Sequence, residues 1–320
     1  MSDAGNARSG MGRSAARVSL AVMLSRVLGL IRDLLFAALL GATKFADAFN
    51  VAFMIPNLVR DLFGEGALSA AFVPTFTEYL RNRGKQDALR LANLVVGAIL
   101  VVVGGITLAG ILGAPLVVAI AAPGFSPEKQ ELTVQATRLL FPFLPIVSLA
   151  AIAMGQLNAQ ERYTAPSLAG AAFNVAAIVA GTILFFMKAP PTTILMGWSG
   201  GMLLGGFAQL AIQLGPLRET GYRFRPGVAF RHPGVRRIMR LMGPAVFGVA
   251  ATNVNIMVNY SFASQVEGAV SWLRYSFRLM WLPIGVFGIA VATIATTQLA
   301  QRAAERDLPG MRATLGTGLR

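Results

Sequence analysis

The chain has 320 residues, of which 55% are hydrophobic and 13% charged, and its mean hydropathy is +0.62. This composition is too apolar for a soluble domain of that length, and it predicts an all-α integral membrane protein with several spans. The absence of Cys excludes disulfide and thiol chemistry. A net charge of +14 would indicate a nucleic-acid partner in a soluble protein. In a membrane protein it can instead set the topology, and the location of the basic residues along the chain distinguishes the two.

Eight apolar stretches follow a basic tail. The tail, residues 1–17, is rich in Gly, Ser and Ala and is expected to be disordered. Each later stretch is long enough to cross a bilayer, and turn-forming residues separate them, as at Ala122–Pro127 and Pro190–Pro191. The expected spans cover residues 18–40, 47–80, 92–118, 139–157, 168–187, 194–214, 241–262 and 270–299.

These spans divide the chain into two lobes. A six-helix lobe at residues 18–217 is followed by a basic cytoplasmic connector at 218–240, which holds the only His, His232. Residues 241–320 then contain two helices and the beginning of a third, so we expect a second lobe that is truncated. His232 is expected to be a solvated loop residue and not a metal ligand.

The basic residues are distributed unevenly between the two sets of loops. Nineteen of the 28 Lys and Arg lie in the tail, in the second, fourth and sixth connectors, and after the eighth span. The other connectors hold only Lys44, Lys129 and Lys188. The positive-inside rule therefore predicts a cytoplasmic N-terminus and a multi-pass protein of the cytoplasmic membrane. Because most of the charge sets topology, no nucleic-acid partner is expected.

Charged residues interrupt the first span. Ser25, Arg26, Gly29, Arg32 and Asp33 fall within about a third of the helix circumference, and apolar residues cover the rest. Exposing one Arg or Asp to lipid at mid-bilayer costs about 2.5 to 3.5 kcal/mol even on lenient scales. This stripe is therefore expected to face a water-filled cavity.

The second, seventh and eighth spans carry similar polar faces. In the second span Arg60 lies on the flank of this face, and Pro56 is expected to kink the helix. In the eighth, Arg274 and Arg278 share a face. The remaining polar residues of these faces are Asp47, Asn50, Asn57, Asp61, Glu65, Thr252, Asn255 and Asn259.

Two interpretations of the charges stay open. The arginines could bind an anionic substrate, or they could form permanent ion pairs with Asp33, Asp47, Asp61 and Glu65 that hold the helices together. Enzyme chemistry has no support, because the sequence offers no Cys/His cluster, nucleotide loop or catalytic triad. A membrane scaffold that recruits partners through the basic connector is the alternative from a different class.

Five short segments in the first part of the chain form a recognisable pattern: Ser25–Asp33, Ala46–Phe49, Pro56–Arg60, Gly64–Ala67 and Ala71–Pro74. This pattern resembles the N-terminal signature of the MurJ (MviN) family, the lipid II flippases of peptidoglycan synthesis. The resemblance continues in order through Ala122–Phe125, Gly243–Ala245, Ser271–Trp272 and Arg278–Met280, so it covers nearly all of the chain.

The resemblance implies the fold of the multidrug/oligosaccharidyl-lipid/polysaccharide (MOP) exporters, which is MATE-like, with two helical lobes around a central cavity and alternating access. It implies lipid II as substrate, membrane lipids and cell-wall synthesis proteins as partners, and no cofactor or metal. Coupling to the membrane potential or to a monovalent ion is left open, as are the roles of Asp61 and Arg274. Export of another polyprenyl-linked glycan or an amphipathic solute is the alternative within transport. The expected substrate-binding residues are Arg26, Arg32, Asp33, Asp47, Asn57, Arg60, Glu65, Asn255, Asn259 and Arg278.

Overall fold

The computed structural model describes residues 2–60 and 67–283, with Leu299, Arg302, Asp307, Gly310, Met311 and Gly316. The chain forms two compact units, residues 1–270 and 271–320. Asp61 and Glu65 lie outside the described residues, as do most residues of the eighth predicted span beyond Pro283.

All secondary-structure elements in the described ranges are helices, which confirms the all-α part of the predicted fold class; the eight spans and the cytoplasmic N-terminus stay predictions. Four of them are long and apolar enough to cross a membrane: Lys85–Leu112, Pro127–Ala159, Thr164–Met187 and Pro191–Glu219. The helices are α1 (Ser2–Leu40), α2 (Lys44–Arg60), α3 (Ala67–Asn82), α4 (Lys85–Leu112), α5 (Ala114–Ala121), α6 (Pro127–Leu140), α7 (Phe143–Ala159), α8 (Thr164–Met187), α9 (Pro191–Glu219), α10 (Pro233–Ala263) and α11 (Ala269–Pro283).

Two predicted spans are divided in the structure. The third is split at Gly113 into α4 and α5, and the fourth follows a break at Phe141–Pro142 between α6 and α7. Pro142 has no N–H for the helix ladder and its ring crowds the preceding turn, which explains the second break. Pro115, two residues after Gly113, also lacks an N–H and is tolerated only in the first turn of a helix, so a new helix, α5, begins at Ala114.

Two predicted boundaries differ from the structure. The tail at residues 1–17 was expected to be disordered, but α1 begins at Ser2. Extending an existing helix avoids the cost of nucleation, and the Ala and Arg of the tail are good helix formers. Likewise α10 begins at Pro233, inside the predicted connector. His232 precedes it with an extended backbone, and its Nδ1 accepts a hydrogen bond from the Gly234 N–H at 3.3 Å. Burial lowers the pKa of His232, and the nearby Arg90 and Arg83 lower it further.

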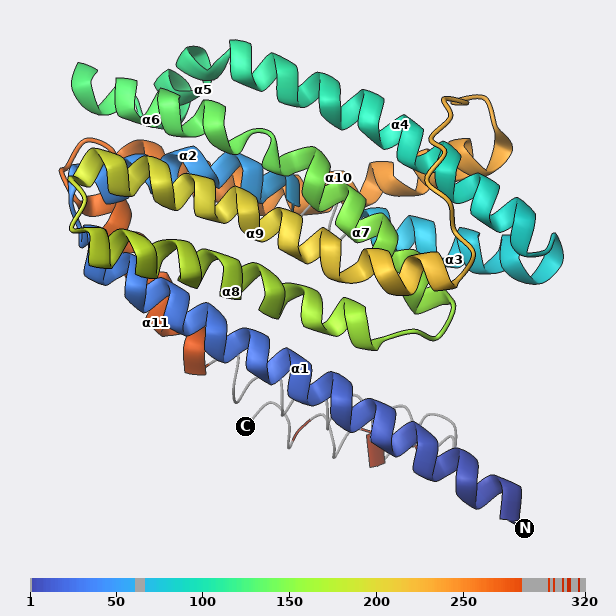
Figure 1. Ribbon diagram of the computed structural model, residues 1–320. Helices are drawn as coiled ribbons and strands as arrows, with labels where there is room; N and C mark the ends of the chain where they lie inside the picture. The colour runs from blue at the N-terminus through green and yellow to red at the C-terminus, as the bar shows by residue number, and fades with distance from the viewer. Residues whose placement is uncertain are drawn as a thin grey trace. The chain divides into compact units, whose positions relative to one another are not determined.

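Among the apolar clusters of side chains that hold the described part of unit 1 together, two join several helices each. One joins α3, α4, α7 and α10 around Phe72, Leu91 and Ile152. In the other, ring contacts run from Phe36 to Phe49 and onward through α2, α7 and α8. In Figure 1, α8 lies between α1 and α9, and α7 lies between α9 and α4.

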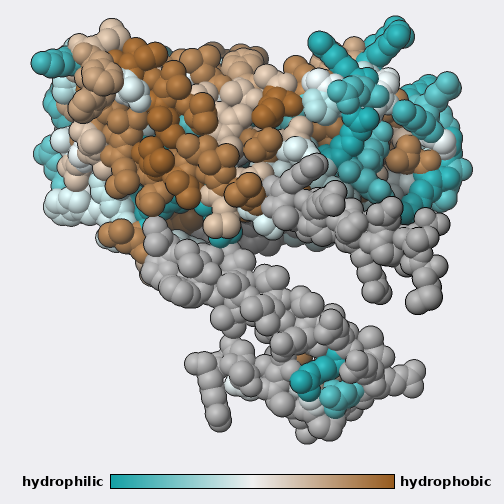
Figure 2. Space-filling view, turned by 60° about the horizontal axis from the view of Figure 1, so that its bottom comes forward, coloured by the Kyte–Doolittle hydropathy of each residue, from teal (hydrophilic) through white to brown (hydrophobic). Residues whose placement is uncertain are grey.

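One face of unit 1 shows the pattern expected of a membrane protein. A broad hydrophobic band lies between hydrophilic ends in Figure 2. Large apolar side chains are exposed on several helices, for example Val27 on α1, Leu108 on α4 and Phe186 on α8. Such extensive apolar exposure is unfavourable in water and favourable in lipid.

The predicted connector that follows α9 is bound to α4. The Asn93 Oδ1 accepts hydrogen bonds from the Tyr222 hydroxyl and the Arg225 N–H, each at 2.9 Å, and its Nδ2 donates to the Arg223 carbonyl at 3.0 Å. One turn further, Gly97 faces Gly227, and a Cβ at Gly97 would lie 2.1 Å from the Gly227 carbonyl oxygen. Glycine therefore permits the close approach of connector and helix.

Candidate substrate-binding site

Arg32 of α1 points toward α8. Its Nε and Nη2 donate to the Asp33 Oδ1 at 3.0 and 2.7 Å, and its Nη1 donates to the Asn174 Oδ1 at 3.1 Å. The guanidinium also lies 5.6 Å from the centre of the Phe173 ring. The side chains of Arg32 and Asp33 are only 15% and 23% exposed. The charged stripe is therefore partly buried against a neighbouring helix.

Asn174 connects α8 to α1 at two points. Besides accepting from Arg32, it donates through Nδ2 to the Ser25 carbonyl at 2.9 Å. Gly170, one turn earlier on α8, brings the backbone within reach of the Ser25 hydroxyl, which a Cβ would meet at 2.6 Å. Asn174 is not among the residues predicted above, although a single Asn within an apolar span is a signal of helix pairing.

The other predicted substrate-binding residues of α1 and α2 are exposed or partly buried. Arg26 is exposed, whereas Asn57 and Arg60 are partly buried near the end of α2. Glu65 follows in the segment outside the described residues. Arg26, Arg32 and Arg60 thus place guanidinium groups on two helices of unit 1.

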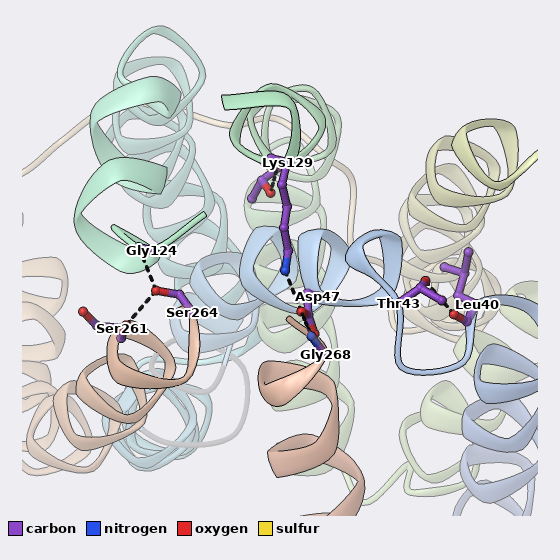
Figure 3. A network of polar contacts seen from close by, with 9 residues as sticks. Leu40, Thr43, Asp47, Gly124, Lys129, Ser261, Ser264 and Gly268 are labelled. Atoms are coloured by element: carbon purple, nitrogen blue, oxygen red, sulfur yellow. Dashed lines mark hydrogen bonds and ion pairs between the residues drawn. The ribbon is translucent and has the colours of Figure 1, made fainter. Parts of the chain in front are cut away.

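Asp47 differs from the prediction. It was expected to line a cavity, but it is fully buried, and its Oδ2 accepts from the Lys129 Nζ at 2.6 Å and the Gly268 N–H at 2.8 Å (Figure 3). Lys129, which was predicted to lie in a loop, is also buried, and its Nζ lies 4.0 Å from the centre of the Phe125 ring. A carboxylate removed from water requires a cation or hydrogen-bond donors, and α6 and the α10–α11 loop supply both. In this structure Asp47 therefore joins α2 to α6 and to the α10–α11 loop, and its side chain does not line a cavity.

Asn255 and Asn259 lie one turn apart on α10. Both are exposed, and the Asn259 Nδ2 donates to the Asn255 Oδ1 at 2.8 Å. Each amide keeps further hydrogen-bonding capacity for a polar ligand.

Arg278 belongs to the second unit, where α11 places it one turn after Arg274. The described residues contain no group of three or more His, Asp and Glu side chains that could hold a metal ion.

The helices are arranged as in several solved structures of membrane transporters. Solved structures with this fold include a lipid II flippase MurJ in an inward closed conformation, with a TM-score of 0.77 and 23% identity over 94% of this chain and 62% of that one. An inward-facing multidrug resistance MATE family transporter of the MOP superfamily gives a TM-score of 0.69 and 15% identity, over 95% of this chain and 69% of that one.

Sequence comparison identifies the family. The model of the family described as lipid II flippase MurJ matches residues 36–320, so the chain belongs to the MurJ family. The lipid II flippase MurJ of Burkholderia cenocepacia is 35% identical over 96% of this chain and 60% of its own length. A probable lipid II flippase MurJ of Rhizobium meliloti is 38% identical over 89% of this chain and 54% of its own length. The chain thus spans a little over half the length of these relatives.

Proposed function

We propose that this chain forms the N-terminal part of a flippase that moves lipid II from the inner to the outer leaflet of the cytoplasmic membrane. The observation that carries the proposal is the family match over residues 36–320, together with the cations that α1 and α2 hold within an apolar bundle. The whole protein would work by alternating access, without a resident cofactor and coupled to the membrane potential or to a monovalent ion.

The chemistry of the substrate fits these cations. Lipid II carries a diphosphate between its sugar head and its polyprenyl chain, and the head must cross about 30 Å of hydrocarbon. A guanidinium stays charged in such a site and can bind phosphate oxygens through two parallel hydrogen bonds. Arg26, Arg32 and Arg60 would bind the diphosphate, and Arg278, on the second unit, is a further proposed substrate ligand. The amides of Asn57, Asn255 and Asn259 would bind sugar or peptide groups, and Asp33 and Glu65 would offset the positive charge of the empty site.

Polar contacts at one end of unit 1 fit a gate of the kind that alternating access requires. There the buried pair of Asp47 and Lys129 joins the α10–α11 loop through Gly268 (Figure 3). Beside it, the Gly124 N–H donates to the Ser264 hydroxyl at 3.0 Å. We propose that these contacts close the periplasmic side and must separate when the cavity opens outward.

The proposed topology has eight spans and a cytoplasmic N-terminus, with the six-helix lobe, connector and second lobe at the predicted boundaries. We expect single Cys residues at Arg83 and Arg225 to be labelled only after permeabilisation, and Cys residues at Ser126 and Gln265 to be labelled in intact cells. All four positions are exposed, and the chain has no Cys of its own. A membrane-impermeant maleimide makes the measurement. Labelling of position 126 only after permeabilisation would reverse the topology.

The proposed function can be tested by complementation, in which this protein replaces the lipid II flippase of a bacterial cell. The full-length protein containing this chain is expected to restore growth to cells depleted of their own lipid II flippase, and to restore labelling of lipid II at the outer membrane face. An inserted, stable protein that leaves lipid II inaccessible from outside would refute lipid II transport. It would favour a different polyprenyl-linked glycan or a scaffold role.

A further inference from the structure

A groove of about 700 Å³ lies between α4 and α9, with α7 at its base. Its walls are apolar, with Val96 from α4, Ile152 and Ala153 from α7, and Leu210 and Leu214 from α9. In Figure 1, α7 lies between α4 and α9, and the connector that follows α9 crosses α4. All three wall helices belong to candidate membrane spans, so the groove is a cavity that hydrocarbon can enter.

The mouth of this groove is basic. Arg218 at the end of α9 and Arg223 in the connector line it, and neither has an ion pair with a carboxylate among the described residues. Glu219, beside Arg218, is already paired with Arg162. The connector that carries Arg223 is fixed by Asn93, so this cation does not depend on a free loop for its position.

Two polar side chains line the inner part of the mouth. Gln156 is 1% exposed, and its Oε1 has no hydrogen-bond partner among the described residues. Tyr222 is buried beside it, and burial raises the pKa of its hydroxyl to about 12. A buried amide oxygen without a donor is unfavourable, and a ligand hydroxyl or a water at the mouth would satisfy it.

We propose that this groove binds one anionic glycerophospholipid, with an acyl chain between α4 and α9 and the phosphate at Arg218 and Arg223. A glycerol hydroxyl of the headgroup would donate to Gln156. The apolar walls suit a hydrocarbon chain, and a pair of arginines at the edge of a span suits a phosphate in the headgroup region. The first residues of the connector, which include Tyr222 and Arg223, line the same groove. Bound lipid would therefore also hold the connector against α4. Binding of this lipid does not depend on which substrate the protein transports.

The charge requirement is tested by lipid retention. The purified protein is mixed with equal amounts of phosphatidylglycerol and phosphatidylethanolamine and analysed by native mass spectrometry. We expect preferential retention of phosphatidylglycerol, and a loss of about tenfold or more in the Arg218→Gln/Arg223→Gln variant. The matched control is Arg225→Gln/Arg231→Gln, which removes the same charge from the same connector outside the groove and should retain the lipid. Equal loss in both variants would overturn the proposal, because general surface charge would then explain the binding.

The apolar part is tested by filling the groove. Leu214→Trp should reduce retention of phosphatidylglycerol, whereas Leu204→Trp, on the same helix but outside the groove, should not; both leucines are partly exposed and should tolerate the ring. Melting temperatures confirm that the variants fold. Retention unaffected by Leu214→Trp would overturn the proposal, as would displacement of phosphatidylglycerol by undecaprenyl phosphate at equal concentration, which would assign the groove to the carrier lipid. Neither outcome bears on whether the protein transports lipid II.

Discussion

Replacing Lys129 by Met is expected to lower the free energy of unfolding by about 3 to 5 kcal/mol, because it leaves a buried carboxylate without its cation. The side chains of Lys129 and Asp47 are 6% and 0% exposed, so water cannot take the place of the lost ammonium. Asp47→Leu should be similarly destabilising, since it strands the Lys129 charge. The double variant Asp47→Leu/Lys129→Met should recover most of the loss, because an apolar pair replaces an ion pair whose burial is itself costly.

The structure offers a matched control for this experiment. Lys44 and Glu128 also join α2 to α6, at 2.8 Å, but their side chains are 34% and 70% exposed. Lys44→Met should therefore change stability by less than about 1 kcal/mol. The measurement is thermal or denaturant unfolding in detergent. Equal effects of Lys44→Met and Lys129→Met, or no recovery in the double variant, would contradict the buried-pair account.

The same variants report on the proposed gate. If separation of the Asp47 contacts accompanies outward opening, the recovered double variant should fold well and yet transport at an altered rate. A double variant with both wild-type stability and wild-type transport would show that this pair only holds the helices together.

Much of the helical architecture could be predicted from the sequence because lipid imposes long apolar runs and loops are marked by Gly, Pro and basic residues. The predicted start of the fifth span near Leu168 and its end at Met187 agree with α8, whose helix begins one turn earlier. Breaks within runs were harder to predict. Phe141–Pro145 contains two prolines, yet hydropathy is continuous across it and suggests a single span.

Partners between distant segments could not be predicted in this way. Helical periodicity places Arg32 and Asp33 near one another on α1, but it cannot show that Asn174, in α8, meets the same guanidinium. Lys129 follows a turn and precedes polar residues, so its sequence context suggests a solvated position. It is buried because Asp47 lies opposite, and that pairing depends on how α2 packs on α6.

The two arginines of α1 should respond differently to truncation. Arg26→Ala should abolish lipid II transport and lower the free energy of unfolding less than Arg32→Ala does, since Arg26 is exposed and the Arg32 side chain is largely buried. Arg32→Ala should abolish transport and also destabilise the protein. It removes hydrogen bonds to Asp33 and Asn174, and bonds that involve charged groups contribute about 1.5 to 3 kcal/mol each. In both cases Lys should restore transport only in part, because an ammonium keeps the charge but loses the bidentate geometry.

The decisive comparison is between Arg32→Ala, Asp33→Ala and the double variant, each measured for lipid II transport and melting temperature. If Arg32 binds the diphosphate, removing Asp33 as well can restore stability, because no charge is left unpaired, but it cannot restore transport. If the pair only holds α1 against α8, the double variant should regain both. Recovery of transport in the double variant would therefore remove Arg32 from the substrate site, whereas stability regained without transport would identify it as a ligand for the diphosphate.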